Sequence, residues 1–314
     1  MPINFYTTNQ LPGDLYTSLI ESFNKAFGLQ LTKEYFDNYY LSTPLGESLH
    51  VLLEEDGIVA GVFTVMPMAY TVSGKHQLLG LAVGTFILQE YRTDPLMLKR
   101  MFNKMKPHLL ERNIEFIYAI PNDNVYKYWK AVVKWNDIAE LDYYIHPVSA
   151  TKLLKFQMYP INKTISKLLN ILTIFRKNRE YKISKNIKIV RDNYFNSARL
   201  KYSESVEDSN IKINYRVHDE KGIKIAYILD YNPRTIFALE RGVKLLSDKK
   251  DSGIDLIAYI GLSDITPLNM LKLPKKLEPR KLYFSGIDLT STNEGLNFFD
   301  RTNWEIELYN FDVK

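Results

Sequence analysis

Hydrophobic and polar positions along residues 1–148 change their spacing several times, between the period of a strand and the period of a helix. The pattern predicts a strand, two helices, three antiparallel strands, a helix, a strand, a helix and a last strand. The first elements are a strand at 3–7, a helix capped by Asp14 and stopped by Gly28, and a helix from Thr32. The three antiparallel strands are 49–54 and 58–66, joined at Asp56-Gly57, and a third near 69–72 that leads into a long apolar run at 77–88. The last elements are a helix begun by Thr93 or Asp94 with Pro95, a strand at 114–120, a helix opened by Asn122 and a strand at 138–145.

The helix after Pro95 carries an apolar stripe made largely of methionine. Met97, Met101, Met105 and Leu109 recur every four residues and so share one face, which predicts core packing. Pro107 falls inside the same helix, where it is expected to kink the helix or end it early.

The second half of the chain opens with another apolar stripe, followed by a partial repeat of the first half. Ile165, Leu168, Leu169, Leu172 and Phe175 predict a helix packed between domains, with a membrane-surface helix as the alternative. Further elements are expected as a hairpin at 212–229 turning at Lys221-Gly222, a helix at 235–246 and strands at 254–260, 282–287 and 304–309. Residues 251–260 resemble residues 111–120, which indicates a weak internal repeat.

Composition limits the protein to a few broad classes. The 314 residues are 46% hydrophobic and 25% charged, as in globular proteins, and their number predicts two domains. Cysteine is absent, which excludes a disulfide framework and an acyl-cysteine intermediate. The N-terminus lacks the pattern of a signal peptide and no long apolar run follows, so a cytoplasmic protein without stable membrane insertion is expected.

Charge is concentrated in one stretch. The formal net charge is +5, but residues 163–191 hold nine basic residues and one acidic residue, a net +8 that leaves −3 elsewhere. Nucleic acid is therefore not expected as a partner over the surface as a whole, because phosphate affinity comes from many clustered cations. Any polyanion partner would have to meet this one stretch. The sequence also lacks the GxxxxGK[ST], HExxH and GxSxG motifs, and its five histidines show no metal spacing, so no metal is expected.

Two passages carry a family resemblance. Residues 86–92 (FILQEYR) run into the helix at Pro95, and residues 116–124 (FIYAIPNDN) open the next helix. These passages resemble the strand-to-helix passages of the GNAT acyltransferases. Residues 38–46 and 61–67 are similar to a narrower group of two-domain GNAT proteins that acylate nucleotide-linked amino sugars.

The resemblance implies an α+β GNAT fold, with a mixed, mostly antiparallel sheet flanked by helices. The implied organisation is a GNAT acyl-CoA-binding domain at 1–148, a helical basic linker at 149–191 and a partial GNAT-like domain at 192–314. The second domain would close the acceptor cleft.

Acyl-CoA, either acetyl-CoA or 3-hydroxybutanoyl-CoA, is the implied co-substrate. A helix N-terminus can bind its pyrophosphate and a free strand edge can pair with its pantetheine arm. The family has a glycine-rich turn at the positions of residues 92–97, and this sequence keeps none of those glycines. The amides of residues 96–98 are still expected to face the anion. The implied cofactor residues are Phe86, Ile87, Leu88, Arg92, Thr93, Asp94, Leu96, Met97, Asn122 and Asn124.

A general acid must protonate the leaving thiolate of coenzyme A. The family's tyrosine position falls on Trp129, so the flanking Tyr126 and Tyr128 are the candidates. Glu54, Glu90 and His76 are unranked candidates for the base, and backbone amides near Leu88 would help to hold the thioester carbonyl. The acceptor would be contacted by Tyr39, Tyr40, Tyr70, Arg234, Phe284 and Trp304.

The leading hypothesis is direct N-acylation of a dTDP-linked 3-amino-3,6-dideoxyhexose for a surface polysaccharide such as the O-antigen of lipopolysaccharide, by a monomer or homodimer. Two alternatives are a non-catalytic binding protein on a GNAT scaffold and a tRNA-dependent aminoacyl transferase of peptidoglycan synthesis. The missing glycines favour the first alternative, and the basic stretch favours the second.

Overall fold

The protein folds into two compact units in a computed structural model that describes residues 1–149, 159–175, 185–193, 196, 199–249, 253–290 and 296–311. Unit 1 comprises Met1–Glu140, Asn186–Arg199 and Leu282–Asn303. Unit 2 comprises Leu141–Lys185, Leu200–Lys281 and Trp304–Lys314. The two units therefore alternate along the chain.

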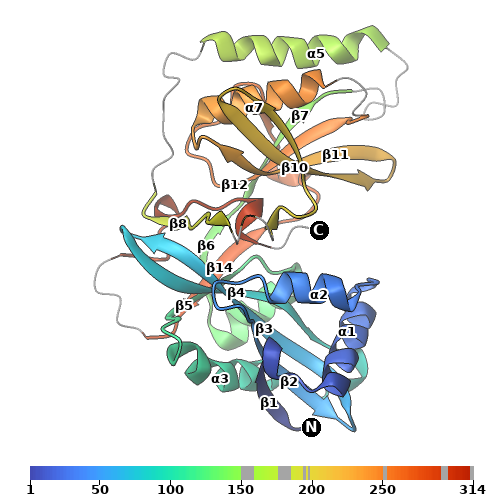
Figure 1. Ribbon diagram of the computed structural model, residues 1–314, viewed down its shortest axis with the longest axis vertical. Coiled ribbons are helices and arrows are strands. Elements are labelled where there is room, and N and C mark those ends of the chain that lie inside the picture. The colour runs from blue at the N-terminus through green and yellow to red at the C-terminus, as the bar shows by residue number, and fades with distance from the viewer. Residues whose placement is uncertain are drawn as a thin grey trace. The chain divides into compact units, whose positions relative to one another are not determined.

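Unit 1 is built on a mixed sheet in the order β1-β2-β3-β4-β5-β14-β6, with β8 also pairing with β3 (Figure 1). Every pair is antiparallel except β4 with β5, which is parallel. The strands are β1 (Ile3–Thr7), β2 (Leu49–Glu55), β3 (Ile58–Val72), β4 (Lys75–Ile87), β5 (Phe116–Ala119), β6 (Asn136–Glu140), β8 (Ile187–Ile189) and β14 (Tyr283–Asp288).

The helices of unit 1 begin and end at capping residues. Gly28 ends the first helix in the left-handed region at φ 64°, the hydroxyl of Thr32 accepts from the Tyr35 amide, and the Asn122 side chain accepts from the Val125 amide. These three predictions are confirmed, whereas Asp14 lies in the first turn and not at the cap. The helices are α1 (Gly13–Phe27), α2 (Lys33–Tyr40), α3 (Met97–Leu110) and α4 (Asp123–Tyr128).

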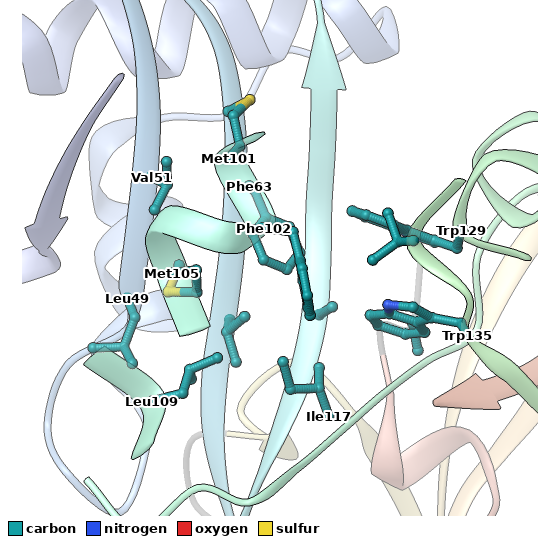
Figure 2. Packing of buried hydrophobic residues seen from close by; sticks show 14 of the residues in the cluster. Leu49, Val51, Phe63, Met101, Phe102, Met105, Leu109, Ile117, Trp129 and Trp135 are labelled. Atoms are coloured by element: carbon teal, nitrogen blue, oxygen red, sulfur yellow. The ribbon is translucent and has the colours of Figure 1, made fainter. Parts of the chain in front are cut away.

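The methionine stripe of α3 is core, as predicted. Met101, Met105 and Leu109 are fully buried and pack with Leu49 and Phe63 of the sheet (Figure 2). The helix continues through Pro107 to Leu110, so the prediction of an early end is wrong. A proline in the last turn removes only one intrahelical hydrogen bond, and α3 loses little by including it.

Strand β3 is continuous, although the sequence predicts a break at Pro67. Its pairing with β2 ends at Val65 and its pairing with β8 begins at Tyr70. Between these two residues β3 has no ladder partner on that edge among the described residues, so Pro67 costs no ladder hydrogen bond there. On its other edge β3 pairs with β4 throughout this stretch.

Unit 2 repeats the central motif of unit 1. Its sheet has the order β13-β7-β12-β11-β10-β9, and β11 and β12 are parallel strands joined by helix α7, as β4 and β5 are joined by α3. This arrangement agrees with the internal repeat. The elements are α5 (Tyr159–Leu172), α7 (Ile236–Asp248), β7 (Asp142–Pro147), β9 (Glu204–Asp208), β10 (Ile211–Glu220), β11 (Ile223–Asn232), β12 (Leu256–Gly261) and β13 (Leu271–Lys272).

Short helical turns complete the two units. They are the 3-10 turns η1 (Thr8–Gln10), η2 (Gln89–Tyr91), η4 (Thr173–Phe175), η5 (Lys275–Leu277), η6 (Arg301–Asn303) and η7 (Leu308–Asn310), and the π-helical η3 (Trp129–Val133). Among the described residues, no helix has the length and apolar character needed to cross a lipid bilayer.

The chain exchanges strands between its two sheets, which the sequence does not predict. The single strand expected at 138–145 is divided at Leu141 into β6 of unit 1 and β7 of unit 2. Strand β14 follows most of unit 2 in sequence but pairs with β5 and β6 of unit 1. The compact units therefore differ from the ranges 1–148 and 192–314.

Two other expectations for the second half also differ from the structure. In the predicted linker 149–191, residues 150–158 and 176–184 lie outside the described residues, and β8 near its end belongs to the sheet of unit 1. The strand expected at 304–309 is instead a single bridge from Glu307 to Gly261 followed by η7.

Candidate functional site

Strands β4 and β5 of unit 1 are paired only over a short stretch. Gly80 pairs with Ile117 and Leu81 with Tyr118. Strand β4 then continues for six residues, and in the described part of the chain these have no ladder partner on the side of β5. This edge offers backbone amides and carbonyls to an extended ligand.

A β-bulge lies within the free stretch of β4. Val62 faces Phe86 and Thr64 faces Val83, so one residue of β3 is opposite both Gly84 and Thr85. Gly84 has φ +59°, and a Cβ placed there would lie 2.7 Å from the Tyr40 hydroxyl oxygen. Sequence reasoning missed this feature, although a single glycine inside a strand pattern is its usual signal.

The end of β4 already has backbone partners. The Leu88 amide donates to the Ala60 carbonyl at 2.8 Å, so it is not free to hold a thioester carbonyl as expected. The Ile87 carbonyl points away from β3 and accepts from Nε of Arg92 at 2.8 Å. Because the side chains of Phe86, Ile87 and Leu88 are buried, these residues can offer only backbone atoms to a ligand.

Nine residues separate the end of β4 from the N-terminus of α3. The N-cap of α3 is Leu96, so the prediction of a cap at Thr93 or Asp94 is wrong. Asp94 lies just before the helix, where its Oδ1 accepts from the Leu96 amide at 2.8 Å and its carbonyl accepts from the Met97 amide at 3.1 Å. These two amides are thus not free as expected, whereas the Leu98 amide has no acceptor among the described residues. Thr93 is exposed beside them.

Tyr128 at the end of α4 reaches this helix terminus. Its hydroxyl oxygen accepts from the Lys99 amide at 3.3 Å, so its own proton remains available for donation. Burial raises the pKa of Tyr128, while the hydrogen bond from Lys99 opposes that shift and Asp94 adds to it. Tyr128 is therefore protonated at neutral pH and can act as a proton donor at the start of α3.

Tyr126 has a different environment. Its hydroxyl donates to Oδ1 of Asp137 at 2.9 Å, and its ring stacks on Tyr283 with centroids 3.8 Å apart. The proton of Tyr126 is thus already used in a surface hydrogen bond, and burial and Asp137 raise its pKa. Of the two predicted tyrosines, Tyr128 is the one whose proton is free.

The other predicted residues near α4 belong to the core or to the first turn of the helix. Trp129 is 1% exposed and stacks on Trp135 with centroids 5.1 Å apart, so the family's tyrosine position is core in this chain (Figure 2). Asn122 is the exposed N-cap of α4, and Asn124 is exposed in its first turn.

Most of the aromatic residues expected to contact an acceptor are buried. Tyr70 and Phe284 are 0% exposed, and the Tyr70 hydroxyl donates to the Tyr118 hydroxyl at 2.8 Å. Tyr40 is 3% exposed beside Gly84. These rings fill the interior of unit 1, because burial of the large apolar surface of an aromatic ring stabilises the fold. They present no ring face to an acceptor in this structure.

Tyr39 is the half-buried member of the set. Its ring lies 5.4 Å from the guanidinium carbon of Arg199, and both groups act electrostatically on Tyr118. Arg199 was not predicted, because nothing in its sequence context marks it. A cation beside two tyrosines is suited to a phosphorylated or carboxylated ligand.

Arg234 and Trp304 belong to unit 2. Arg234 forms a bidentate pair with Glu307, with both N···O distances at 2.9 Å, and lies over the ring of Tyr231 at 3.9 Å. Trp304 is 0% exposed. Both are structural residues of that unit, so the six predicted acceptor residues do not form one group.

None of the three candidate bases stands out. His76 is exposed near the start of β4, ten residues before Phe86 and therefore about 33 Å from it along the strand. Glu90 pairs with Lys25 on the surface, which lowers its pKa, and Glu54 accepts from the Asn4 side chain.

The sequence matches no protein-family model and no curated protein. Solved structures are similar in fold. A GCN5-related N-acetyltransferase from Anabaena variabilis has a TM-score of 0.58 and 13% identity, with 92% of this chain and 74% of that chain covered. A second, from Kribbella flavida, has a TM-score of 0.55 and 9% identity over 90% and 71%.

A third similar structure is the N-myristoyltransferase of Saccharomyces cerevisiae with bound myristoyl-CoA, with a TM-score of 0.53 and 12% identity over 92% of this chain and 79% of that chain. The free edge of β4, the helix after it and the parallel strand β5 thus occur within a fold shared with N-acyltransferases. The chain has the α+β fold of the GCN5-related N-acetyltransferases.

Proposed function

We propose that the protein is an acyl-CoA-dependent N-acyltransferase whose site lies in unit 1. The observation that carries this proposal is the free edge of β4, which leads to the α3 terminus where Tyr128 holds a donatable proton. Pantetheine amides would pair with the edge beyond Leu81. Arg92, whose Nε is fixed by the Ile87 carbonyl, would pair with the phosphates.

Binding of the pyrophosphate requires a rearrangement at the start of α3. The amides of Leu96, Met97 and Lys99 have acceptors, and the carboxylate of Asp94 repels an anion. A phosphate would displace this side chain toward Arg100, whose guanidinium lies 3.3 Å from it. Coenzyme A is therefore expected to bind more weakly than at a glycine-rich turn.

The proposed reaction is direct transfer. The acceptor amine attacks the thioester carbonyl, an N–C bond forms, and the tetrahedral intermediate collapses with loss of the C–S bond. The ammonium proton leaves to water, and the coenzyme A thiolate takes the proton of Tyr128. Water restores that proton at the end of the cycle.

For the acceptor we propose the amino group of a nucleotide-linked sugar, with a dTDP-linked 3-amino-3,6-dideoxyhexose as the first candidate and acetyl or 3-hydroxybutanoyl as the acyl group. The likeness of residues 38–46 and 61–67 to sugar-acylating GNAT proteins supports this choice. Arg199 beside Tyr39 supports it independently, because a cation and a ring suit a nucleotide phosphate and base. The product would serve surface polysaccharide synthesis in the cytoplasm.

The test is release of free thiol from acyl-CoA, which should depend on the amino sugar. Tyr128→Phe should lower kcat about 100-fold, because general acid catalysis contributes at least this much. Tyr126→Phe is the matched control and should change kcat little. Equal losses in both variants would contradict the assignment, and no turnover on any dTDP- or UDP-linked amino sugar would contradict the proposed acceptor.

A non-catalytic binding protein is the second candidate, favoured by the occupied amides at the start of α3. Calorimetry separates the two functions. Nucleotide-sugar binding without any binding of coenzyme A would support the second candidate and overturn the first.

A further inference from the structure

Helix α5 is attached to unit 2 by polar side chains. Ser166 and Asn170, one turn apart, are 7% and 6% exposed. The hydroxyl of Ser166 lies 2.8 Å from Nε2 of His146, and the Asn170 amide donates to the Ser247 hydroxyl at 3.0 Å. Asn269 in turn donates to the Asn170 side-chain oxygen at 3.1 Å. This network fixes which face of α5 points inward.

The contact with His146 has a defined direction. Its Nδ1 lies 2.6 Å from the Asn269 carbonyl, which can only accept, so Nδ1 carries the proton. Nε2 is therefore the acceptor for the Ser166 hydroxyl in the neutral ring. Burial lowers the pKa of His146 and maintains this neutral form, although the Asn269 carbonyl and Asp248 favour the charged ring.

The outward face of α5 and the following turn η4 is apolar. This outward face consists of Leu168 (57% exposed), Ile171 (48%), Leu172 (44%), Ile174 (66%) and Phe175 (73%). A surface helix normally buries its apolar stripe and exposes its polar one, and α5 does the reverse. The expectation that the predicted stripe is packed against protein is wrong for three of its members, Leu168, Leu172 and Phe175. A contiguous exposed apolar face of this kind marks an interaction surface.

The sequence that contains α5 is strongly basic, which favours an anionic partner. Between Asp142 and Asp192 the sequence contains eleven lysines and arginines and one acidic residue, Glu180. Lys167 is exposed on α5 itself, and Phe175 is followed directly by Arg-Lys in the sequence. A second copy of this chain would bring the same positive charge to the contact and be repelled.

We propose that the outward face of α5 binds the surface of a membrane that contains anionic phospholipid. The five apolar side chains would enter the boundary between headgroups and acyl chains, and the basic residues would pair with lipid phosphates. The helix would lie in the plane of the interface, held to unit 2 through Ser166 and Asn170. This proposal does not depend on the acyltransferase reaction.

Vesicle flotation of the full chain tests the proposal. The protein should float with phosphatidylcholine vesicles that contain phosphatidylglycerol, at least about tenfold more than with phosphatidylcholine alone, and added salt should reduce this binding. The double variant Ile174→Asp/Phe175→Asp should lose it. Leu277→Asp changes an apolar residue of unit 2 that is 62% exposed elsewhere, and this control should bind like the wild type.

Fluorescence gives a second readout. The native tryptophans 129, 135 and 304 are at most 2% exposed, so Phe175→Trp adds an exposed reporter. Its emission should shift to shorter wavelength with anionic vesicles and stay unchanged with neutral ones. The proposal is overturned if the wild type ignores anionic vesicles, if the double variant with an unchanged melting temperature still floats, or if the outward face instead mediates dimers in sedimentation.

Discussion

Both units contain a strand-helix-strand crossover between parallel strands, but the connecting segments and the strand ends differ between them. In unit 1, β4 leads through α3 to the parallel strand β5, and in unit 2, β11 leads through α7 to the parallel strand β12 (Figure 1). Nine residues separate β4 from α3, with exposed side chains at Arg92 and Thr93. Only three residues separate β11 from α7.

The ends of the parallel strands differ even more. In unit 2 the C-terminal segment contacts both β11 and β12, the Leu262 amide donates to the Ile306 carbonyl at 2.9 Å, and Glu307 holds Arg234. In unit 1 the end of β4 has no ladder partner toward β5 among the described residues. The same topology therefore gives a filled core in unit 2 and a candidate site in unit 1. The difference comes from the side chains and the connecting segments at the ends of the parallel strands.

Removal of Arg234 should have the largest effect on this comparison. Arg234→Met leaves Glu307, 1% exposed, without its bidentate partner, and should lower the free energy of unfolding of unit 2 by about 3–5 kcal/mol. Lys25→Met breaks the exposed pair with Glu90 and should cost far less, because solvent screens an exposed ion pair. Hydrogen exchange resolved by peptide measures both, and equal costs would show that the buried pair does not hold unit 2 together.

Acid should weaken unit 1 through His50 in β2. Burial lowers the pKa of His50 from 6.5 to about 3, and its ring nitrogens lie 2.9 Å from the hydroxyl oxygens of Thr8 and Thr64. The unfolded chain therefore takes up the proton first, so stability is complete above about pH 6.5 and falls as the pH drops toward 3. At pH 5 the loss is about 2 kcal/mol.

The control for this prediction is His50→Gln, which keeps polar contacts without titrating. Denaturation of unit 1 by urea at pH 7 and pH 5 should show a smaller pH dependence in His50→Gln than in the wild type. The same slope in both proteins would remove His50 as the cause.

The bulge at Gly84 should give an effect no larger than that of His50. Gly84→Ala combines a positive φ with contacts of 2.7–2.8 Å to Tyr40 and Phe23, and should cost about 2 kcal/mol. Gly74→Ala has φ +82° and no neighbour within 4 Å, so it should cost only about 1 kcal/mol. Thermal unfolding measures the difference, and equal values would mean that the bulge tolerates a side chain.

Local signals in the sequence predicted much of the fold. The Asp56-Gly57 and Lys221-Gly222 turns, the caps at Thr32 and Asn122, and the stripe ending at Leu109 all depend on residues close together in the chain. The exchange of β7 and β14 between the sheets was not predictable, because strand pairing depends on contacts between distant segments. The hydrophobic pattern of 138–145 is the same whichever sheet it joins.

The candidate site was predictable only in part. The strand before Pro95 and the helix after it follow from the pattern, but the partners of Leu96, Met97 and Lys99 depend on side-chain geometry. Tyr126 and Tyr128 are two residues apart and look equivalent in sequence. The hydrogen bond from Lys99, 29 residues away, is what distinguishes Tyr128.

The measurement that tests the central claim most directly is amide hydrogen exchange with and without acetyl-CoA. Exchange should slow in residues 82–100, which include the free edge of β4 and the start of α3, and should stay unchanged in residues 226–240 of unit 2. Unchanged exchange at 82–100 under saturating acetyl-CoA, or protection at 226–240 instead, would contradict the assignment of the site to unit 1.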